Sequence, residues 1–165
     1  MYRVAILTVS DSSARGERED LSGPAIRAIV EQNGLTVVDY RILPDEAAAL
    51  QDYFCRIADS DAADLILTTG GTGFSPRDVT PEATLAVAER SVPGIPEAMR
   101  IHSLQYSSRS MLSRAAAAIR RRTLIVNLTG SPKAVRENLE YAIDALLHGL
   151  EMLRGEGSAD CARRD

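Results

Sequence analysis

Apolar residues along the chain fall into two kinds of pattern, which predict strands and helices in alternation. Short runs rich in β-branched and aliphatic residues are typical of strands that are buried on both faces. Longer segments carry apolar residues at steps of three and four, which is typical of helices with one buried face. The expected strands are 2–9, 35–43, 64–68 and 123–128. The expected helices are 22–32, 46–58, 81–90, 95–104, 110–120 and 131–153.

The order strand, helix, strand, helix, strand favours an α/β layer fold. The ends of the segments carry ordinary signals: Ser22 is the expected N-cap of the first helix, and Gly34 follows its last turn. No internal repeat and no second core are visible in the pattern. We therefore expect one domain over residues 1–154 and a flexible, polar C-terminal tail over residues 155–165.

The composition limits the partners that the protein can have. Of the 165 residues, 45% are hydrophobic and 25% are charged, as in ordinary globular proteins. The formal net charge of −4 gives the molecule no overall attraction for nucleic acid, so an anionic substrate needs a local cluster of donors. No apolar run approaches the roughly 20 residues that cross a membrane. The chain enters its first apolar segment without a charged leader, so we expect a cytoplasmic protein.

Cysteine and histidine offer little chemistry in this sequence. The two cysteines, Cys55 and Cys161, cannot build a disulfide framework, and no histidine stands at metal-ligand spacing from either. We expect both to be incidental thiols. His102 and His148 are expected on helix surfaces rather than in a catalytic role.

Polar residues follow the predicted strands at the points where α/β folds place their sites. Residues 10–12 read Ser-Asp-Ser and begin the polar stretch 10–22, which predicts a loop. Residues 69–73 follow the third strand, residues 129–133 follow the last one, and Asp45 comes just after the second. We expect these segments to meet at one edge of the sheet.

Residues 69–73 read Thr-Gly-Gly-Thr-Gly. Three glycines let the backbone approach a ligand closely and turn its N–H groups toward it, and the hydroxyls add uncharged donors. Such a loop holds phosphates when a helix begins nearby. The spacing is neither that of a Walker motif nor that of the dinucleotide fingerprint. The alternative is a plain turn between a strand and a helix.

Three charged residues near these loops each have two interpretations. Asp45 is either the N-cap of the helix that starts at Glu46 or part of a site. Asp78 precedes the helix start at Pro81, where a carboxylate can cap the helix or hold a metal ion. Lys133 stands in the first turn of the longest helix, whose free N–H groups make either an anion site or an ordinary helix start.

Taken together, these segments resemble the molybdopterin adenylyltransferase family, also called the Mog or molybdopterin-binding domain family. The matching segments come in the family's order, cover nearly the whole chain, and are most specific over residues 69–84. They are TVSDS (8–12), LPDE (43–46), LTTGGTG (67–73), PRDVTPEAT (76–84), PG (93–94), EAMR (97–100), LSR (112–114) and TLIVNLTGSPK (123–133).

The resemblance implies a three-layer α/β sandwich with a mostly parallel sheet flanked by helices, usually assembled as a homotrimer. It implies a role in molybdenum cofactor biosynthesis, in which molybdopterin and Mg·ATP give adenylyl-molybdopterin and pyrophosphate. The two aspartates that the family requires match Asp45 and Asp78, which we expect to bind Mg²⁺ or to orient its waters. A molybdenum-insertion enzyme is the implied partner.

The resemblance also implies the residues that bind the nucleotide and the pterin. The expected binding residues are Ser10, Asp11, Ser12, Thr69, Gly70, Gly71, Thr72, Gly73, Arg77, Thr80, Glu82, Met99, Arg100, Ser113, Arg114, Asn127, Gly130, Ser131 and Lys133. The expected counter-charges among them are Arg77, Arg100, Arg114 and Lys133. The terminal phosphate of molybdopterin is largely a dianion at neutral pH, so its attack on the α-phosphate of ATP needs no general base.

The chain departs from the family pattern at two places. Thr129 stands where the last loop usually has a proline, and its N–H and hydroxyl can reorganise that loop, which bears on pterin affinity more than on the fold. The run 115–120 lacks the glycine expected before its arginine. Two other functions fit the same fold: a non-catalytic molybdopterin carrier or scaffold, and a different nucleotide enzyme such as a pyrophosphatase. Retention of both aspartates argues against the carrier, since a pure pterin binder needs no Mg²⁺ site.

Overall fold

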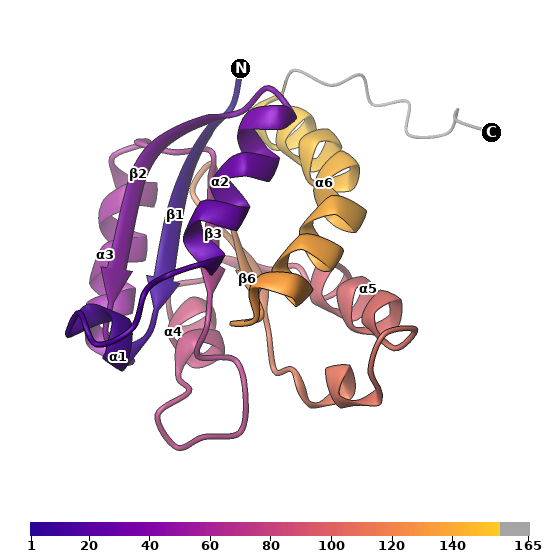
Figure 1. Ribbon diagram of the computed structural model, residues 1–165. Coiled ribbons are helices and arrows are strands. Elements are labelled where there is room, and N and C mark those ends of the chain that lie inside the picture. The colour runs from indigo at the N-terminus through magenta and orange to yellow at the C-terminus, as the bar shows by residue number, and fades with distance from the viewer. Residues whose placement is uncertain (156–165) are drawn as a thin grey trace.

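The structure is a computed structural model, and it describes residues 1–155. Strands and helices alternate along this part of the chain (Figure 1). The strands are β1 (Arg3–Val9), β2 (Thr36–Leu43), β3 (Leu65–Thr69), β4 (Arg90–Ser91), β5 (Ala117–Arg120) and β6 (Thr123–Leu128). The helices are α1 (Asp11–Ala14), α2 (Ser22–Gln32), α3 (Ala47–Asp59), α4 (Thr80–Ala86), α5 (Gly94–Ser103), the 3-10 helix η1 (Ser108–Leu112) and α6 (Pro132–Arg154). The tail predicted over 155–165, with Cys161, lies outside the described residues from position 156 onward.

One six-stranded sheet in the order β2-β1-β3-β6-β5-β4 forms the middle layer. The first four strands are parallel, and β5 and β4 join antiparallel at one edge. Helices α2, α5 and α6 pack on one face of the sheet, and α3 and α4 pack on the other (Figure 1). The predicted α/β sandwich of three layers with a mostly parallel sheet is confirmed.

The central strand β1 shows why an unbroken apolar run folds as a strand here. Val4 and Ile6 belong to the core beneath α2 and α6, whereas Ala5 and Leu7 belong to the core beneath α3. All four side chains are fully buried. Because alternate residues of a strand face opposite sides, one apolar run supplies both cores. Burial of each of the larger side chains stabilises the fold by roughly 1.5–3 kcal/mol.

Helix α6 is the longest helix, as the apolar stripe predicts. Its buried side chains run from Val135 to Leu150 and pack on the core that α2 and α5 share. Gly155 ends the helix in the left-handed conformation, with φ of 74°, which glycine adopts at little cost. None of the helices within residues 1–155 has the length and apolarity needed to cross a lipid bilayer.

The helix predicted over residues 110–120 is wrong. Residues 108–112 form η1, and the alanine run ends in β5, which pairs antiparallel with β6. Alanine favours helices, but Ala117 and Ala118 are buried where β5 lies against the neighbouring strand. Strand pairing outweighs local propensity at this position. The helix predicted over 81–90 ends early, at Ala86, because the chain then turns into β4 beside β5.

Two local predictions near the first loop are also wrong. The stretch 10–22 is not all loop, because α1 forms within it and Ser10 is its N-cap. Ser22 does not cap α2. The Asp20 carboxylate accepts hydrogen bonds from the N–H groups of Ser22 and Gly23 at 2.9 and 3.0 Å, so the capping oxygen comes from two residues earlier.

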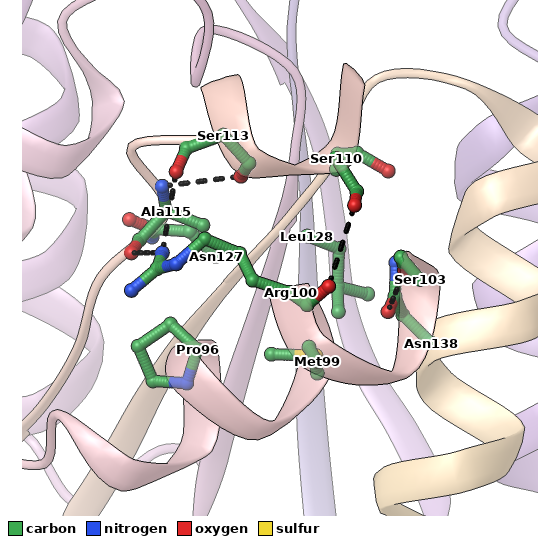
Figure 2. Close-up of a pocket in the computed structure, with 11 residues that line it drawn as sticks. Pro96, Met99, Arg100, Ser103, Ser110, Ser113, Ala115, Asn127, Leu128 and Asn138 are labelled. Carbon is green, nitrogen blue, oxygen red and sulfur yellow. Dashed lines mark hydrogen bonds between the residues drawn. The ribbon is translucent and has the colours of Figure 1, made fainter. Parts of the chain in front are cut away.

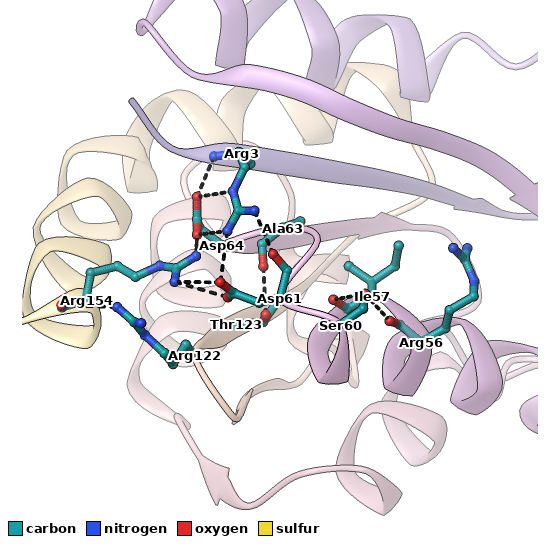
Figure 3. A network of polar contacts seen from close by, with 10 residues as sticks. All are labelled: Arg3, Arg56, Ile57, Ser60, Asp61, Ala63, Asp64, Arg122, Thr123 and Arg154. Carbon is teal, nitrogen blue, oxygen red and sulfur yellow. Dashed lines mark hydrogen bonds and ion pairs between the residues drawn. The ribbon is translucent and has the colours of Figure 1, made fainter.

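A cluster of charged side chains lies at the amino ends of the parallel strands (Figure 3). The Asp64 carboxylate accepts hydrogen bonds from the backbone and guanidinium N–H groups of Arg3 and forms an ion pair with Arg154. The side chains of Asp64 and Arg154 are only 4% and 8% exposed. Asp61 contacts the same two arginines but is 52% exposed. The cluster therefore fastens the end of α6 to the starts of β1 and β3.

We predict that Asp64→Asn lowers the free energy of unfolding by about 3–5 kcal/mol, because it removes the buried counter-ion of Arg154 and leaves only the exposed Asp61 to pair with that guanidinium. Urea unfolding at pH 7 measures the loss. Asp61→Asn is the matched control, since it removes an exposed charge from the same arginines and should cost less than about 1 kcal/mol. Equal losses for the two variants would contradict the role given to Asp64.

Candidate active site

The carboxyl ends of the four parallel strands meet at one edge of the sheet, where α/β folds place their sites. A cleft of about 260 Å³ opens at this edge. Its walls come from the segments that follow β1, β3 and β6, with Asp45 and Asp78 added from two further segments. The fold thus brings together Ser10, Gly70 and Gly130, which lie far apart in the sequence.

Asp11 and Asp45 form reciprocal hydrogen bonds between the loops that follow β1 and β2. The N–H of Asp11 donates to the Asp45 carboxylate over 2.9 Å, and the N–H of Asp45 donates to the Asp11 carboxylate over 3.0 Å. Arg77 makes a two-pronged contact with Asp11, through Nε at 3.0 Å and Nη2 at 2.9 Å. The N-cap of α3 is Glu46. The interpretation of Asp45 as that cap is therefore wrong, and its carboxylate instead joins two loops at the cleft.

The glycine loop has no room for side chains at two positions. Gly70 and Gly71 have φ of 95° and 65°. A Cβ on Gly70 would lie 2.2 Å from the carbonyl oxygen of Val9, and one on Gly71 would lie 2.3 Å from Oγ1 of Thr80. The Thr80 hydroxyl donates to the Gly70 carbonyl over 3.0 Å. The loop therefore lines the cleft with its backbone, as a phosphate site requires.

Arg114 fixes the far part of the same loop. Its guanidinium donates to the carbonyl oxygens of Gly73 and Asp78, each at 2.7 Å, and forms an ion pair with Glu82. The Asp78 carboxylate accepts a hydrogen bond from the N–H of Ser75 over 3.0 Å and makes no capping bond to α4. The interpretation of Asp78 as a helix cap is therefore wrong. The guanidinium of Arg114 therefore holds the conformation of the loop through these contacts.

Negative charge gathers at one end of the cleft. Burial raises the pKa of Asp45, and the nearby carboxylates of Asp11 and Asp78 raise it further. The contact with Arg77 lowers the pKa of Asp11. A cation would relieve this repulsion. Within residues 1–155 no three acidic, histidine or cysteine side chains cluster closely enough to chelate a metal ion, so its other ligands would come from substrate and water.

A second and narrower cavity, of about 20 Å³, lies between α5, η1 and the end of β6 (Figure 2). The expected residues Met99, Arg100, Ser113 and Asn127 line it. Arg100 Nη1 donates to the carbonyl oxygens of Ser113 and Ala115 at 3.3 and 3.0 Å. The segment between η1 and β5 is therefore held against α5 by this arginine.

Asn127 is fully buried, and its amide is engaged inside the protein. Its oxygen accepts the N–H of Ala116, and its nitrogen donates to the hydroxyls of Thr68 and Thr84. These bonds use the acceptor and both donors of the side chain. Asn127 thus joins three segments beneath the cavity, with no donor left for a ligand.

The other expected residues surround the two cavities without all reaching them. The side chain of Lys133 is 83% exposed and its ammonium lies 3.8 Å from Glu137. Ser12 contacts the hydroxyl of Ser10 at 3.2 Å. The first turn of α6 nevertheless reaches the cleft, through Pro132. Lys133 is thus a surface residue next to the site in this structure.

Asp20 lines the cleft and was not among the residues expected there. Its carboxylate accepts hydrogen bonds from the hydroxyls of Thr8, at 2.5 Å, and of Tyr40. Burial raises the pKa of Asp20, but these bonds and those from the N–H groups of Ser22 and Gly23 outweigh it and hold the pKa below its ordinary value. Burial and Asp20 raise the pKa of Tyr40 to about 12. An acid two residues before a predicted helix start was the signal that could have found it.

Known proteins of similar sequence identify the family of this chain. A family model described as "Probable molybdopterin binding domain" matches residues 5–148. The chain belongs to this family. A molybdopterin adenylyltransferase from Helicobacter pylori (strain J99) is 39% identical over 154 residues, which cover 92% of this chain and 88% of that protein. A molybdopterin adenylyltransferase from Escherichia coli (strain K12) is 40% identical over 155 residues, which cover 90% of this chain and 79% of that protein.

Solved structures of similar proteins share the fold of this molybdopterin-binding domain. The molybdopterin biosynthesis enzyme MoaB from Thermus thermophilus has a TM-score of 0.89 and 46% identity, covering 94% of this chain and 98% of that chain. The tungsten cofactor synthesizing protein MoaB from Pyrococcus furiosus has a TM-score of 0.82 and 33% identity, covering 93% and 98%. The shared fold therefore spans nearly all of the described chain.

We predict that Asp20→Asn destabilises this molybdopterin-binding domain at pH 7 by roughly 1–3 kcal/mol, because an acceptor of several hydrogen bonds loses its charge. The folded pKa of Asp20 lies below the unfolded one. Its stabilisation is therefore fully present above the ordinary value of 3.8 and is lost as the pH falls through the folded pKa.

Urea unfolding of wild type and variant from pH 7 downward should show the two converging as the pH falls below 3.8 and through the folded pKa of Asp20. Glu19→Gln is the matched control, because Glu19 is an exposed neighbour of Asp20. A difference between wild type and Asp20→Asn that stays constant with pH would show that the charge of Asp20 is not what stabilises the fold.

Proposed function

We propose that this protein adenylylates molybdopterin in molybdenum cofactor biosynthesis, using ATP and releasing pyrophosphate. The observation that carries the proposal is the convergence of Asp45, Asp78 and residues 69–71 of the glycine loop at one cleft. A loop that lines the cleft with its backbone suits phosphates, and two carboxylates suit the Mg²⁺ that accompanies ATP. The relatives named molybdopterin adenylyltransferase, at 39% and 40% identity, support the same reaction.

In this reaction the terminal phosphate of molybdopterin is the nucleophile. One of its oxygens forms a bond to the α-phosphorus of ATP, the bond from that phosphorus to the bridging oxygen breaks, and pyrophosphate leaves with the electron pair. A phosphate monoester is largely dianionic at neutral pH, so no side chain has to take a proton from it. The protein must instead align two polyanions and offset their repulsion.

The residues around the cleft suit this task. We assign the backbone of Gly70 and Gly71 and the hydroxyl of Ser10 to the phosphates of the nucleotide. We assign Asp45 and Asp78 to Mg²⁺, because the nearby Asp78 carboxylate helps to raise the pKa of Asp45 and a cation would offset that repulsion. When bound, Mg²⁺ neutralises phosphate charge and makes the α-phosphorus easier to attack.

We assign the pterin end of molybdopterin to the second cavity, which Met99, Arg100 and Ser113 line. Gly130 lines the main cleft, and its neighbour Thr129 lines the second cavity. A molecule with a phosphate in one and a pterin in the other would therefore cross the loop after β6. A space of 20 Å³ admits one small group, so most of the ring would lie at its mouth.

A carrier or scaffold on the same fold would need the second cavity but not the cluster of carboxylates. Holding Asp45 beside two other carboxylates is electrostatically unfavourable, and a pterin binder gains nothing from it. Pyrophosphate release from ATP that requires molybdopterin supports the adenylyltransferase. Molybdopterin binding without release would indicate the carrier, and ATP hydrolysis without any pterin would indicate a nucleotide pyrophosphatase.

We further propose that the protein acts in the cytoplasm and passes its product to an enzyme that inserts molybdenum. Cys55 is a free thiol, which is compatible with a reducing compartment. Adenylyl-molybdopterin is a phosphoric anhydride, so a reaction that cleaves this bond has to consume it.

We also propose that the protein is a homotrimer. Apolar side chains gather on α5 and on η1 with the turn between them, and they are strongly exposed. They are Ile101, Leu104, Tyr106, Met111 and Leu112, with exposures from 46% to 70%. A patch of this kind is typical of a protein–protein contact, and the family resemblance supports three subunits.

We predict that Asp45→Asn and Asp78→Asn each lower the rate of adenylylation by two to three orders of magnitude, roughly the effect of losing one electrostatic contact to a transition state. Raised Mg²⁺ should restore part of the rate, and raised pH should restore none, because neither residue acts as a base. Nucleotide should still bind weakly through the glycine loop. Single-turnover adenylylation against Mg²⁺ and pH measures these effects.

Asp52→Asn is the control for this experiment, since it removes an exposed carboxylate of α3 that lies outside the cleft. Its rate should match that of the wild type. Rescue of either cleft variant by pH but not by Mg²⁺ would show that the aspartate is a general base and that the assigned role is wrong.

We predict that the wild type sediments as a trimer at micromolar concentration. Ile101→Glu should weaken association by more than about tenfold, because it would bury a charge at the contact. Leu85→Glu on α4 alters a side chain of comparable exposure, 51%, away from the patch and should leave the trimer intact. A wild type that sediments as a monomer at this concentration would contradict the proposed trimer.

A further inference from the structure

One hydroxyl beside the second cavity has no partner in the protein. Within residues 1–155 the Oγ1 atom of Thr129 is the only buried side-chain nitrogen or oxygen without a hydrogen bond. The residue is held in place from another side, because the Thr69 hydroxyl donates to its carbonyl oxygen over 2.6 Å. A buried hydroxyl without a partner lowers stability, so its position needs an explanation.

The space that this residue lines is the size of a single polar group. Thr129 lines the cavity of about 20 Å³. Arg100 and Ser113 line the same cavity (Figure 2). A space of this volume holds one water molecule or one exocyclic group of a larger ligand. A whole ring does not fit without movement of the walls.

The polar groups around this space are mainly donors. Arg100 uses Nη1 for two carbonyl oxygens, and none of its other N–H groups is bonded to the described part of the chain. The oxygen of Ser113 accepts the N–H of Ala115, so its own proton is free to be donated. The two remaining serine hydroxyls on the wall are bonded within the protein: Ser103 donates to Asn138, and Ser110 donates to the Arg100 carbonyl.

We propose that Thr129 is a specificity residue that donates a hydrogen bond to a ring carbonyl oxygen of the pterin substrate. The inference rests on the proposed function, and it adds which group of the substrate enters the cavity and which residue selects it. A carbonyl oxygen has two lone pairs and can accept from Thr129 and from one of the other donors, Arg100 or Ser113, whereas an amino group in the same place would bring more donors to a site that already has them. The cavity therefore selects 4-oxo over 4-amino pteridines.

The test compares two probes, 6-hydroxymethylpterin and 2,4-diamino-6-hydroxymethylpteridine, which differ in the carbonyl at ring position 4. Thr129→Val keeps the shape of the side chain and removes the hydroxyl, and Thr129→Ser keeps the hydroxyl. Calorimetry should show the 4-oxo probe bound about tenfold more weakly by Thr129→Val and nearly normally by Thr129→Ser. The 4-amino probe should bind equally to all three proteins.

A stability measurement separates this role from a structural one. Removing a hydroxyl that has no partner should leave the melting temperature of Thr129→Val unchanged or higher. The KM for molybdopterin should rise in that variant while the KM for ATP stays the same. A lower melting temperature together with unchanged affinity for the 4-oxo probe would overturn the proposal.

The proposed function and this inference fail in different ways. If wild type and Thr129→Val both adenylylate molybdopterin with the same KM and bind the 4-oxo probe equally, the reaction stands and the role of Thr129 is wrong. If the wild type binds the 4-oxo probe but releases no pyrophosphate with molybdopterin, the proposed reaction fails, and the affinities of the variants still decide the role of Thr129.

Discussion

The cleft depends on how closely the backbone of Gly70 lies against the end of β1. A Cβ at Gly70 would stand 2.2 Å from the Val9 carbonyl oxygen, and a Cβ on Gly130 would stand 3.4 Å from the Cα of Gly70. The segments that follow β1, β3 and β6 therefore meet backbone to backbone. A side chain at Gly70 would force them apart, because packed backbones cannot yield by that much. Ser10, Asp45 and the glycine loop keep their places only while this contact holds.

The same contact brings carboxylates close to one another, and the site offsets their repulsion only in part. Bringing the loops together places Asp11, Asp45 and Asp78 near one another. Arg77 contacts Asp11 directly and lowers the pKa of Asp45 only in part, because burial and the other two carboxylates still leave it raised. A site with this balance would repel a bare nucleotide more than one that carries a divalent cation. We therefore propose that it takes a metal–nucleotide complex, since the described part of the chain has too few ligands to chelate a metal tightly by itself.

The sequence predicted the layers and the site loops well, because buried parallel strands and a long amphipathic helix have strong local patterns. It failed where distant contacts decide the conformation. The run 115–120 favours a helix locally, but pairing with β6 makes part of it a strand. Asp45 looked like a helix cap because it directly precedes the predicted helix. Its actual bond, from the N–H of Asp11, joins two loops that are distant in the sequence. Arg114 donates hydrogen bonds to the carbonyl oxygens of Gly73 and Asp78, and the Thr129 hydroxyl has no partner. Both features depend on tertiary packing, which the spacing of residues in the sequence does not reveal.

We propose that Asp45 and Asp78 complete a metal site only when a nucleotide is present. Mn²⁺ in place of Mg²⁺ makes this measurable by electron paramagnetic resonance, with α,β-methylene ATP as a nucleotide that cannot lose pyrophosphate. We expect little Mn²⁺ bound to the protein alone, one Mn²⁺ per chain with the analogue, and loss of that ion in Asp78→Asn. Equal Mn²⁺ binding with and without the analogue, or an unchanged ternary complex in Asp78→Asn, would contradict it.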